Sequence, residues 1–281
     1  MFPENIGKDL SLDEVSISNG ELYTILTNKE AKGGKGALVA IIKGTKTIDI
    51  SLVLDKMTKE QKQTVKEVTL DFCPSMEASI KKSFLKAKIV ADRFHAQQLV
   101  SEAVQEQRIR FRWKAIESEN NATKRACQQK KTYQPKIYTN GDTKKQLLAR
   151  SRHLLFKPES KWTENQRERA NILFSEFPKL KDSYNLSMMF RSFYEHTEDK
   201  GIAREKLNQW YQKVNEKNID SFMTISKYVQ NHEEKILNYF DNRSTNASAE
   251  SFNAKLKGFR ALVRGVRDKK FFLFRVAKLY A

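Results

Sequence analysis

The pattern of apolar and polar positions predicts three short strands near the start of the chain. Residues 10–17, 21–27 and 38–43 are short runs rich in β-branched and other apolar side chains. The Ser-Asn-Gly segment at residues 18–20 suits a hairpin turn between the first two runs. A glycine-rich stretch at residues 32–36 then makes a flexible connection into the third.

Helical spacing then alternates with two further strands. Residues 68–71 and 88–94 are apolar runs that predict strands, and three helical segments precede or separate them, the last at residues 76–87. In this last helix we expect Ile80, Phe84 and Leu85 to face inward. The apolar positions that suggest the first two helices are Ile48, Leu52 and Met57, and then Val65.

The order of elements, β-β-β-α-β-α-β followed by a helix, predicts an α/β fold with a ribonuclease H-like mixed sheet. In such a sheet the first and fourth strands lie side by side, which would bring Asp13 and Asp71 together. The first strand changes phase, because Leu10 and Leu12 alternate out of step with Val15 and the residues after it. This change predicts a bulge, or the working end of the strand, at Asp13 and Glu14. Glu14 is therefore a rival to Asp13.

From His95 to Asp241 the chain carries almost no strand signal. Long helical patterns are interrupted at residues 133–141, 157–160, 177–178 and 200–201. We interpret this region as a large all-helical insertion. The predicted domains are residues 1–95 and 242–281, which form the ribonuclease H-like core, and residues 96–241, which form the insertion.

The last part of the chain predicts an amphipathic helix after a polar loop at residues 242–248. Apolar residues recur at spacings of three and four and make one stripe. Glu250 and Asn253 lie on a separate polar face, so Glu250 would point toward a site. Gly265 is expected to close this helix, and residues 270–280 to form a final one. The stripe consists of Ala249, Phe252, Leu256, Phe259 and Val263.

Composition narrows the class of partner. The net charge of +18 and the pI near 9.7 favour nucleic acid over an anionic membrane surface. The apolar content of 39% is enough for a globular fold. Cys73 and Cys127 have no metal-ligand spacing, and the longest aliphatic run, residues 37–42, is too short to span a membrane. We expect a cytoplasmic protein, or a nuclear one if its source has a nucleus, without a signal peptide.

Three acids have the placement that divalent-metal chemistry requires. Asp13 and Asp71 each end an apolar run, and Glu250 lies on the late amphipathic helix. Magnesium prefers carboxylate oxygens, and clustered carboxylates are costly without a cation because like charges raise one another's pKa. An isolated acid at a strand end is usually solvated or caps a helix. The joint pattern favours a two-metal site, with Mg²⁺ or alternatively Mn²⁺, for phosphodiester chemistry.

Residues 89–95, Ile-Val-Ala-Asp-Arg-Phe-His, are the second notable motif. Asp92 ends a strand and His95 opens the next helix, where it could donate to a phosphate or orient water. The alternative interpretation is that Asp92 caps this helix and that His95 is a surface residue. Asp92 is also an alternative to Asp71 as the second metal ligand.

Basic residues near these acids are candidates for contacts with the DNA backbone. Some follow His95 and interleave with Phe111 and Trp113, while others flank Glu250. The alternative is a solvated charged face. The candidates are Arg93, Arg108, Arg112, Lys255, Lys257, Arg260 and Arg264.

At these residues the chain resembles the DDE transposases of the ISL-three insertion-sequence group. The resemblance covers nearly the whole chain and is carried by residues 10–16, 68–71, 87–95 and 249–265, with Asp-Arg-Phe-His as its most specific motif. It implies that Asp13, Asp71 and Glu250 are the catalytic acids and metal ligands, with Asp92 and His95 as an accessory motif.

The resemblance further implies metal-dependent cleavage of element ends and strand transfer into target DNA. It implies a homodimer or larger assembly on DNA in a bacterial, nucleoid-associated setting. Because the usual upstream zinc-binding and helix-turn-helix part is not in this sequence, we expect that a separate polypeptide or the helical insertion recognises the ends. The alternatives are a non-catalytic or domesticated DNA-binding remnant and a structure-specific nuclease.

Overall fold

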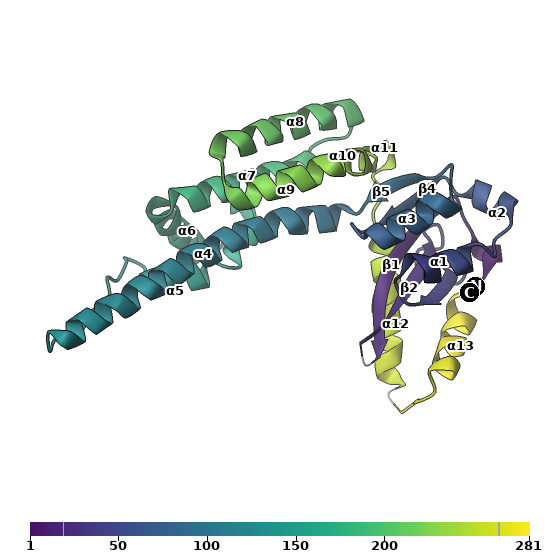
Figure 1. The fold of residues 1–281 in the computed structure, drawn as a ribbon, viewed down its shortest axis with the longest axis horizontal. Coiled ribbons are helices and arrows are strands. Elements are labelled where there is room, and N and C mark those ends of the chain that lie inside the picture. The colour runs from purple at the N-terminus through teal and green to yellow at the C-terminus, as the bar shows by residue number, and fades with distance from the viewer. Residues whose placement is uncertain (19, 264) are drawn as a thin grey trace. The chain divides into compact units, whose positions relative to one another are not determined.

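The chain forms two compact units. The computed structural model describes residues 1–18, 20–263 and 265–281. One unit consists of Met1–His95 and His232–Ala281, and the other is the helical segment Ala96–Asn231 between them (Figure 1). The sequence pattern suggested boundaries after residues 95 and 241. In the structure residues 232–241 group with the sheet.

The first unit is built on a five-stranded mixed sheet of order β3-β2-β1-β4-β5 (Figure 1). The first three strands pair antiparallel, whereas β4 pairs parallel with β1, and β5 pairs parallel with β4. This is the ribonuclease H-like arrangement that the element order predicted, with the first and fourth strands adjacent. The strands are β1 (Asp9–Ser18), β2 (Glu21–Asn28), β3 (Leu38–Lys43), β4 (Glu67–Leu70) and β5 (Lys88–Ala91).

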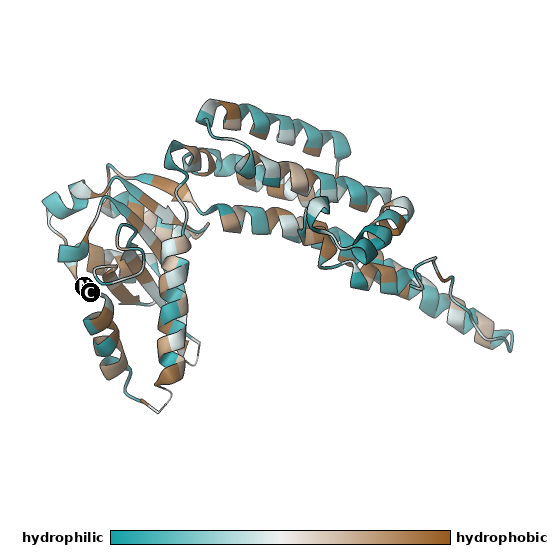
Figure 2. Cartoon of the chain, turned by 180° about the vertical axis from the view of Figure 1, so that it is seen from behind, coloured by the Kyte–Doolittle hydropathy of each residue, from teal (hydrophilic) through white to brown (hydrophobic). Residues whose placement is uncertain are grey.

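Helices cover the two faces of this sheet. On one face, Leu12 and Leu70 belong to a buried cluster with residues of α1 and α3. On the other, Val15 and Ile25 pack with α12 and α13 through Phe252 and its neighbours. Figure 2 shows hydrophobic positions gathered in the strands between the helices. The helices of this unit are α1 (Thr47–Leu54), α2 (Lys59–Thr64), α3 (Pro74–Ser83), α10 (Glu233–Leu237), α11 (Tyr239–Asn242), α12 (Ala247–Leu262) and α13 (Lys269–Tyr280).

The first strand is regular where the sequence predicted a bulge. The pairing of β1 with β2 runs without a shift from Leu10 to Ser16 and is irregular only beyond that point. The phase change has another cause, because both faces of the strand are buried. Leu10 and Leu12 face one helical layer, and Val15 faces the other. Asp13 therefore lies within the strand.

Helix α1 buries a different face from the one that its apolar residues suggested, whereas at α3 the predicted inward residues Ile80 and Phe84 are buried and only Leu85 is not. In α1 the buried positions are Ile50 and Leu54, whereas Ile48 and Leu52 are exposed. Leu85, which we expected to face inward, lies beyond the end of α3 and is 85% exposed. In such short segments, apolar residues on several sides leave the inward direction undetermined.

The second unit is helical, as predicted. Its only β pairing within residues 96–231 is an isolated bridge between Ile137 and Thr143. Trp162 and Trp210 are buried and donate to backbone carbonyls, whereas Trp113 is exposed. No helix in the described ranges is long and apolar enough to cross a bilayer. The helices are α4 (Arg93–Gln128), which begins before the unit, α5 (Lys144–Arg150), α6 (Glu164–Glu176), α7 (Pro178–Glu195), α8 (Lys200–Lys217) and α9 (Asp220–Asn231).

Candidate active site

Three aspartates lie at one level on three neighbouring strands. The parallel pairing of β1 with β4 ends at Leu12 opposite Leu70, and that of β4 with β5 ends at Leu70 opposite Ala91. The next residue of each strand path therefore lies at the same edge, and strand alternation puts its side chain on the α12 face. These next residues are Asp13, Asp71 and Asp92.

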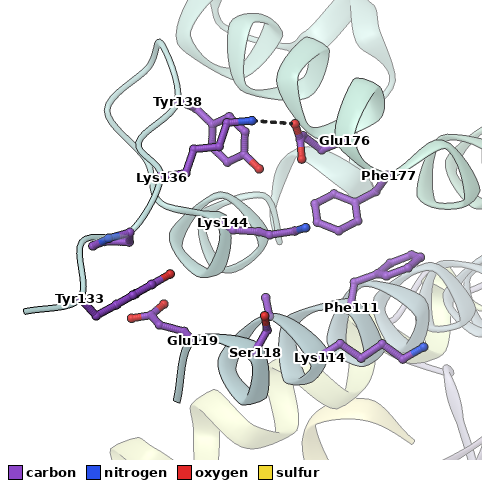
Figure 3. A pocket seen from close by; sticks show the side chains of 12 residues that line it. Phe111, Lys114, Ser118, Glu119, Tyr133, Lys136, Tyr138, Lys144, Glu176 and Phe177 are labelled. Carbon is purple, nitrogen blue, oxygen red and sulfur yellow. Dashed lines mark hydrogen bonds and ion pairs between the residues drawn. The ribbon is translucent and has the colours of Figure 1, made fainter. Parts of the chain in front are cut away.

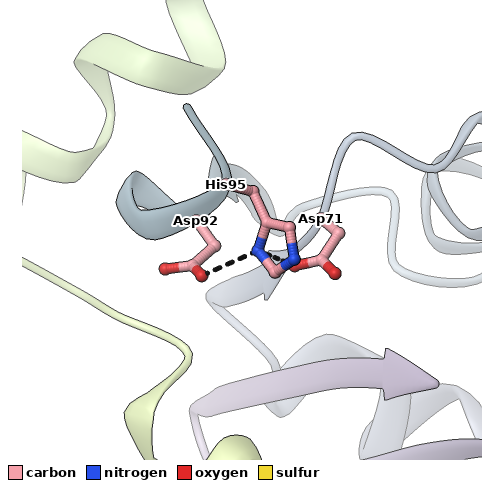
Figure 4. A group of neighbouring side chains, drawn as sticks. All are labelled: Asp71, Asp92 and His95. Atoms are coloured by element: carbon pink, nitrogen blue, oxygen red, sulfur yellow. Dashed lines mark hydrogen bonds and ion pairs between the residues drawn. The ribbon is translucent and has the colours of Figure 1, made fainter. Parts of the chain in front are cut away.

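His95 lies between two of these acids. Its Nδ1 atom is 2.9 Å from Asp71 Oδ1 and 3.1 Å from Asp92 Oδ2. Figure 4 shows the ring held between the two carboxylates. Hydrogen bonding to Asp71, and then to Asp92, raises the pKa of His95 to about 10. The candidate ligand atoms of Asp71, Asp92 and His95 all lie within 4.8 Å of one another.

Asp13 is connected to helix α12. Asn253 Nδ2 donates to Asp13 Oδ2 at 2.7 Å, which fixes the carboxylate against the helix. Burial, followed by the charge of Asp71, raises the pKa of Asp13 to about 6. Asp13 therefore carries a charge that its surroundings disfavour unless a cation compensates it.

Glu250 lies one turn before Asn253 on α12. It is exposed, whereas Ala249 and Phe252 beside it are buried, so it occupies the polar face of the helix. Its pKa is raised by partial burial and then by the charge of Asp92, with a smaller contribution from Asp71 and an opposing one from His95. The Glu250 carboxylate therefore lies within electrostatic reach of the aspartates.

The two rival acids fall in different places. Glu14 is exposed and, as the neighbour of Asp13 along a regular strand, points to the opposite face of the sheet. Asp92 is fully buried inside the cluster. Its Oδ1 atom has no hydrogen-bond partner in the described ranges. Of the two, only Asp92 shares the site with Asp71.

A buried lysine that sequence reasoning missed supports this region from the side. Lys29 Nζ forms an ion pair with Glu67 at 3.0 Å and also contacts the hydroxyls of Thr69 and Ser244. Asn242 donates to the other Glu67 oxygen at 2.8 Å. The segment that leads into α12 is therefore tied to β4. No spacing in the sequence marks Lys29, because its partners come from two distant segments, β4 and the residues before α12.

The basic residues around α12 differ in their availability. Lys255 and Lys257 are both exposed, and Lys255 also donates to the carbonyl of Gly33 at 2.8 Å. Arg264 lies outside the described residues. Of the two described lysines, Lys257 is the one that is not bonded to this carbonyl.

Two further arginines of this unit are held by neighbouring groups. Arg93 donates to the Tyr239 hydroxyl at 3.1 Å and lies over that ring. Arg260 donates to the carbonyl of Val266 at 2.8 Å. Both side chains are half-buried, so each presents only part of its guanidinium to solvent.

The remaining two candidate arginines, both on α4, differ in exposure. Arg108 is 6% exposed and donates to Gln105 Oε1 at 2.7 Å and to the Leu148 carbonyl at 2.9 Å. Burial lowers its pKa. Arg112 is exposed. Arg108 is therefore not on the surface that the sequence assigned to DNA contact, because it fastens α4 to α5.

The donor set fits a hard divalent cation. Asp13, Asp71 and Asp92 supply carboxylate oxygens on adjacent strands, and Glu250 supplies a further one nearby. The unpartnered buried oxygen of Asp92 is a group that a cation would satisfy. The raised pKa of Asp13 likewise indicates a carboxylate whose charge a cation would stabilise.

Comparison with known proteins gives one match. A family model described as transposase, that of the ISL-three DDE group, matches residues 10–276, which is most of the chain. The matched region includes every acid of the cluster. No curated protein and no solved structure matches significantly. The chain belongs to the ISL-three family of DDE transposases.

Proposed function

We propose that this chain catalyses metal-dependent cleavage of insertion-sequence ends and their transfer into target DNA. Asp13, Asp71 and Glu250 are the proposed catalytic acids, with Asp92 and His95 as accessory residues. The observation that carries the proposal is the alignment of three aspartates at one sheet edge, with α12 bonded to the first of them through Asn253. The family match supports transposition as the class of reaction.

The acids would hold two divalent ions, Mg²⁺ or alternatively Mn²⁺. When bound, two such ions stabilise the attacking and the leaving oxygens of a phosphodiester. Asn253 keeps the Asp13 carboxylate turned toward the site. Lys29 and its partners hold the segment before α12, so that Glu250 stays beside the aspartates.

The orientation of His95 defines what it offers to DNA. Because Nδ1 faces Asp71 and Asp92, Nε2 is the nitrogen left to donate to a phosphate oxygen. Asp92 is buried and fixes the ring, which makes it a positioning residue as well as a candidate ligand. Lys257 and Arg112 are exposed cations for the DNA backbone.

We extend the proposal to the assembly that acts on DNA. Cutting two element ends and joining them to one target requires two sites, so a dimer or larger assembly on DNA is expected. Recognition of the end sequence would come from a separate DNA-binding polypeptide or from the helical unit. Sedimentation of the protein with and without end DNA checks this stoichiometry.

The test compares wild type with Asp71→Asn on DNA that carries the element ends, in Mg²⁺ and in Mn²⁺. Wild type should nick and join the DNA, and the variant should lose at least about a hundredfold in rate, because a ligand to the ions is removed. Asp55→Asn, at an exposed position of the same unit, is the matched control. Equal rates for wild type and Asp71→Asn contradict the assignment.

A second candidate, a DNA-binding protein without cleavage activity, has one observation in its favour. His95 forms ion pairs with both Asp71 and Asp92, so these acids already have a partner without metal. Binding of end DNA that is indifferent to divalent ions, with no cleavage in either metal, would support this candidate. Cleavage that prefers branched DNA to element ends would instead indicate a structure-specific nuclease.

A further inference from the structure

The helical unit contains a cavity of about 560 Å³, a size typical of small-ligand sites. All of its lining residues belong to this unit, so it is separate from the acidic cluster. Its walls come from α4, from the segment between α4 and α5, from the first residue of α5, and from the end of α6 with Phe177, which follows it. Figure 3 shows side chains from all of these segments directed toward a common space.

Aromatic rings form much of the wall. Phe111 of α4 and Phe177 pack with ring centroids 5.0 Å apart at 44°. Tyr133 and Tyr138 are half-buried on the segment between α4 and α5, across the cavity from these rings (Figure 3). Four rings from three segments therefore surround a space of limited size, and Lys136 Nζ already lies over the Tyr138 ring, 4.9 Å from its centre. The ring faces that remain open are surfaces on which nucleobases stack.

Cations line the same cavity. Charged lining residues form two ion pairs: Lys136 Nζ lies 3.5 Å from Glu176 Oε1, and Lys145 Nζ lies 2.6 Å from Glu119 Oε1. Lys114 and Lys144 have no carboxylate within ion-pair distance in the described ranges, and Lys144 Nζ lies 5.3 Å from the centre of the Phe177 ring. Lys144 also acts on Glu176 by charge from beyond ion-pair distance. Lysines that are outside ion pairs favour an anionic group at this place.

The segment between α4 and α5, which carries Tyr133 and Tyr138, is held in place by the buried acid Asp142. Asp142 is fully buried and forms ion pairs with Arg150 of α5 and with Arg169 of α6, the latter at 2.8 Å. The Tyr138 amide donates to the Asp142 carbonyl at 2.9 Å. The cavity wall is thus held to two helices, which reduces the entropy that a ligand would have to remove on binding.

We propose that this cavity binds one unpaired nucleotide of the DNA on which the chain acts, with the base among the aromatic rings and a phosphate at Lys114 and Lys144. The base must be unpaired, because bases inside a duplex are stacked on one another and cannot present their faces to side chains. The inference rests on the proposed function for the identity of the polymer, but it does not depend on catalysis.

The test measures binding of two fluorescent duplexes in EDTA, one fully paired and one with a single unpaired nucleotide. Wild type should prefer the second by about tenfold, because base–aromatic contacts of this kind contribute on that order. Tyr133→Ala should abolish the preference. Trp113→Ala, an exposed aromatic on α4 outside the cavity, should retain it. Lys144→Gln should weaken binding more than Lys124→Gln, at an exposed position on the same unit.

A second measurement does not depend on a variant that must fold. Wild type is irradiated with DNA that carries 5-iodouracil at the unpaired position, and the cross-linked peptide is sequenced; the expected peptide contains Tyr133 or Tyr138. Equal affinity for the two duplexes, or cross-links only outside the cavity, overturns this inference and leaves the proposed catalysis standing. Absence of any DNA binding would contradict both proposals.

Discussion

At the scale of single residues, Asp92 is a buried acid whose hydrogen bonding is incomplete. One of its oxygens accepts from His95, while the other is buried and has no partner in the described ranges. A buried unsatisfied acceptor costs about 1–3 kcal/mol, and more when it is charged. The folded protein would recover this free energy when a cation binds. The stability of the protein should therefore depend on divalent metal.

Saturating Mg²⁺ or Mn²⁺ should raise the unfolding temperature of wild type by roughly 5 °C, because a ligand that binds only the folded state stabilises it. Asp92→Asn should lose most of this increase. Asp55→Asn should keep it, because its side chain is half exposed and outside the cluster. Scanning calorimetry with EDTA and with each metal checks this. An unchanged increase in Asp92→Asn would remove Asp92 from the ligand set.

At the residue scale, some features of the candidate site could be predicted from the sequence and others could not. Asp13, Asp71 and Asp92 could be grouped in advance, because each follows an apolar run and parallel strands end at a common edge. The bond from Asn253 to Asp13 and the burial of Arg108 could not. Both depend on which side chain of a helix meets a neighbour, and the charge of a residue does not determine that.

At the scale of elements, the position of α12 depends on a small polar network. Lys29 and Glu67, whose side chains are 13% and 7% exposed, form the ion pair to which Ser244 and Asn242 attach. Removing one member of a buried pair leaves the other charged and uncompensated. The network therefore affects both stability and the placement of Glu250.

Lys29→Met should lower the free energy of unfolding by about 3–5 kcal/mol, because Glu67 loses its cation. Amide hydrogens at residues 242–250 should exchange faster. Lys43→Met is the matched control, since that side chain is 74% exposed and its ion pair with Glu21 is long, at 3.9 Å. Urea unfolding and hydrogen exchange measure the two effects. If both variants behave alike, the network does not hold the segment before α12.

Element order was predictable from the sequence, whereas the facing of short helices was not. Alternation and turn residues identify β1 to β5, and the order in which they occur selects the sheet. In α1, Ile48 and Leu52 are exposed although they are apolar, because Ile50 and Leu54 fill the space above the sheet. Tertiary packing decides between two apolar sides, and local spacing does not contain that information.

At the scale of the whole molecule, the charge of +18 is distributed over residues with different tasks. Some cations are structural, as Arg108 is inside the helical unit, and others, such as Arg112, are exposed on the same helix. Only exposed cations can release counterions from DNA. The salt dependence of DNA binding therefore reports fewer charges than composition suggests.

Arg112→Gln should reduce the slope of log affinity against log salt by about 1, with similar losses on every DNA sequence. Arg108→Gln should leave the slope unchanged and lower the free energy of unfolding by about 1.5–3 kcal/mol, because it removes charge-assisted hydrogen bonds to Gln105 and Leu148. Fluorescence anisotropy between about 50 and 200 mM salt measures the slopes. A reduced slope for Arg108→Gln would contradict this division.

The interruption of the sheet unit by Ala96–Asn231 has a consequence for the order in which the protein is made. A ribosome delivers the three aspartates early, but Glu250 and Asn253 emerge only after the entire helical unit has been synthesised. Until then Val15 and Ile25 lack the cover that α12 and α13 provide. A truncated or stalled chain thus has an incomplete acid set and an exposed apolar sheet face. We expect such fragments to be bound by chaperones and degraded by proteases.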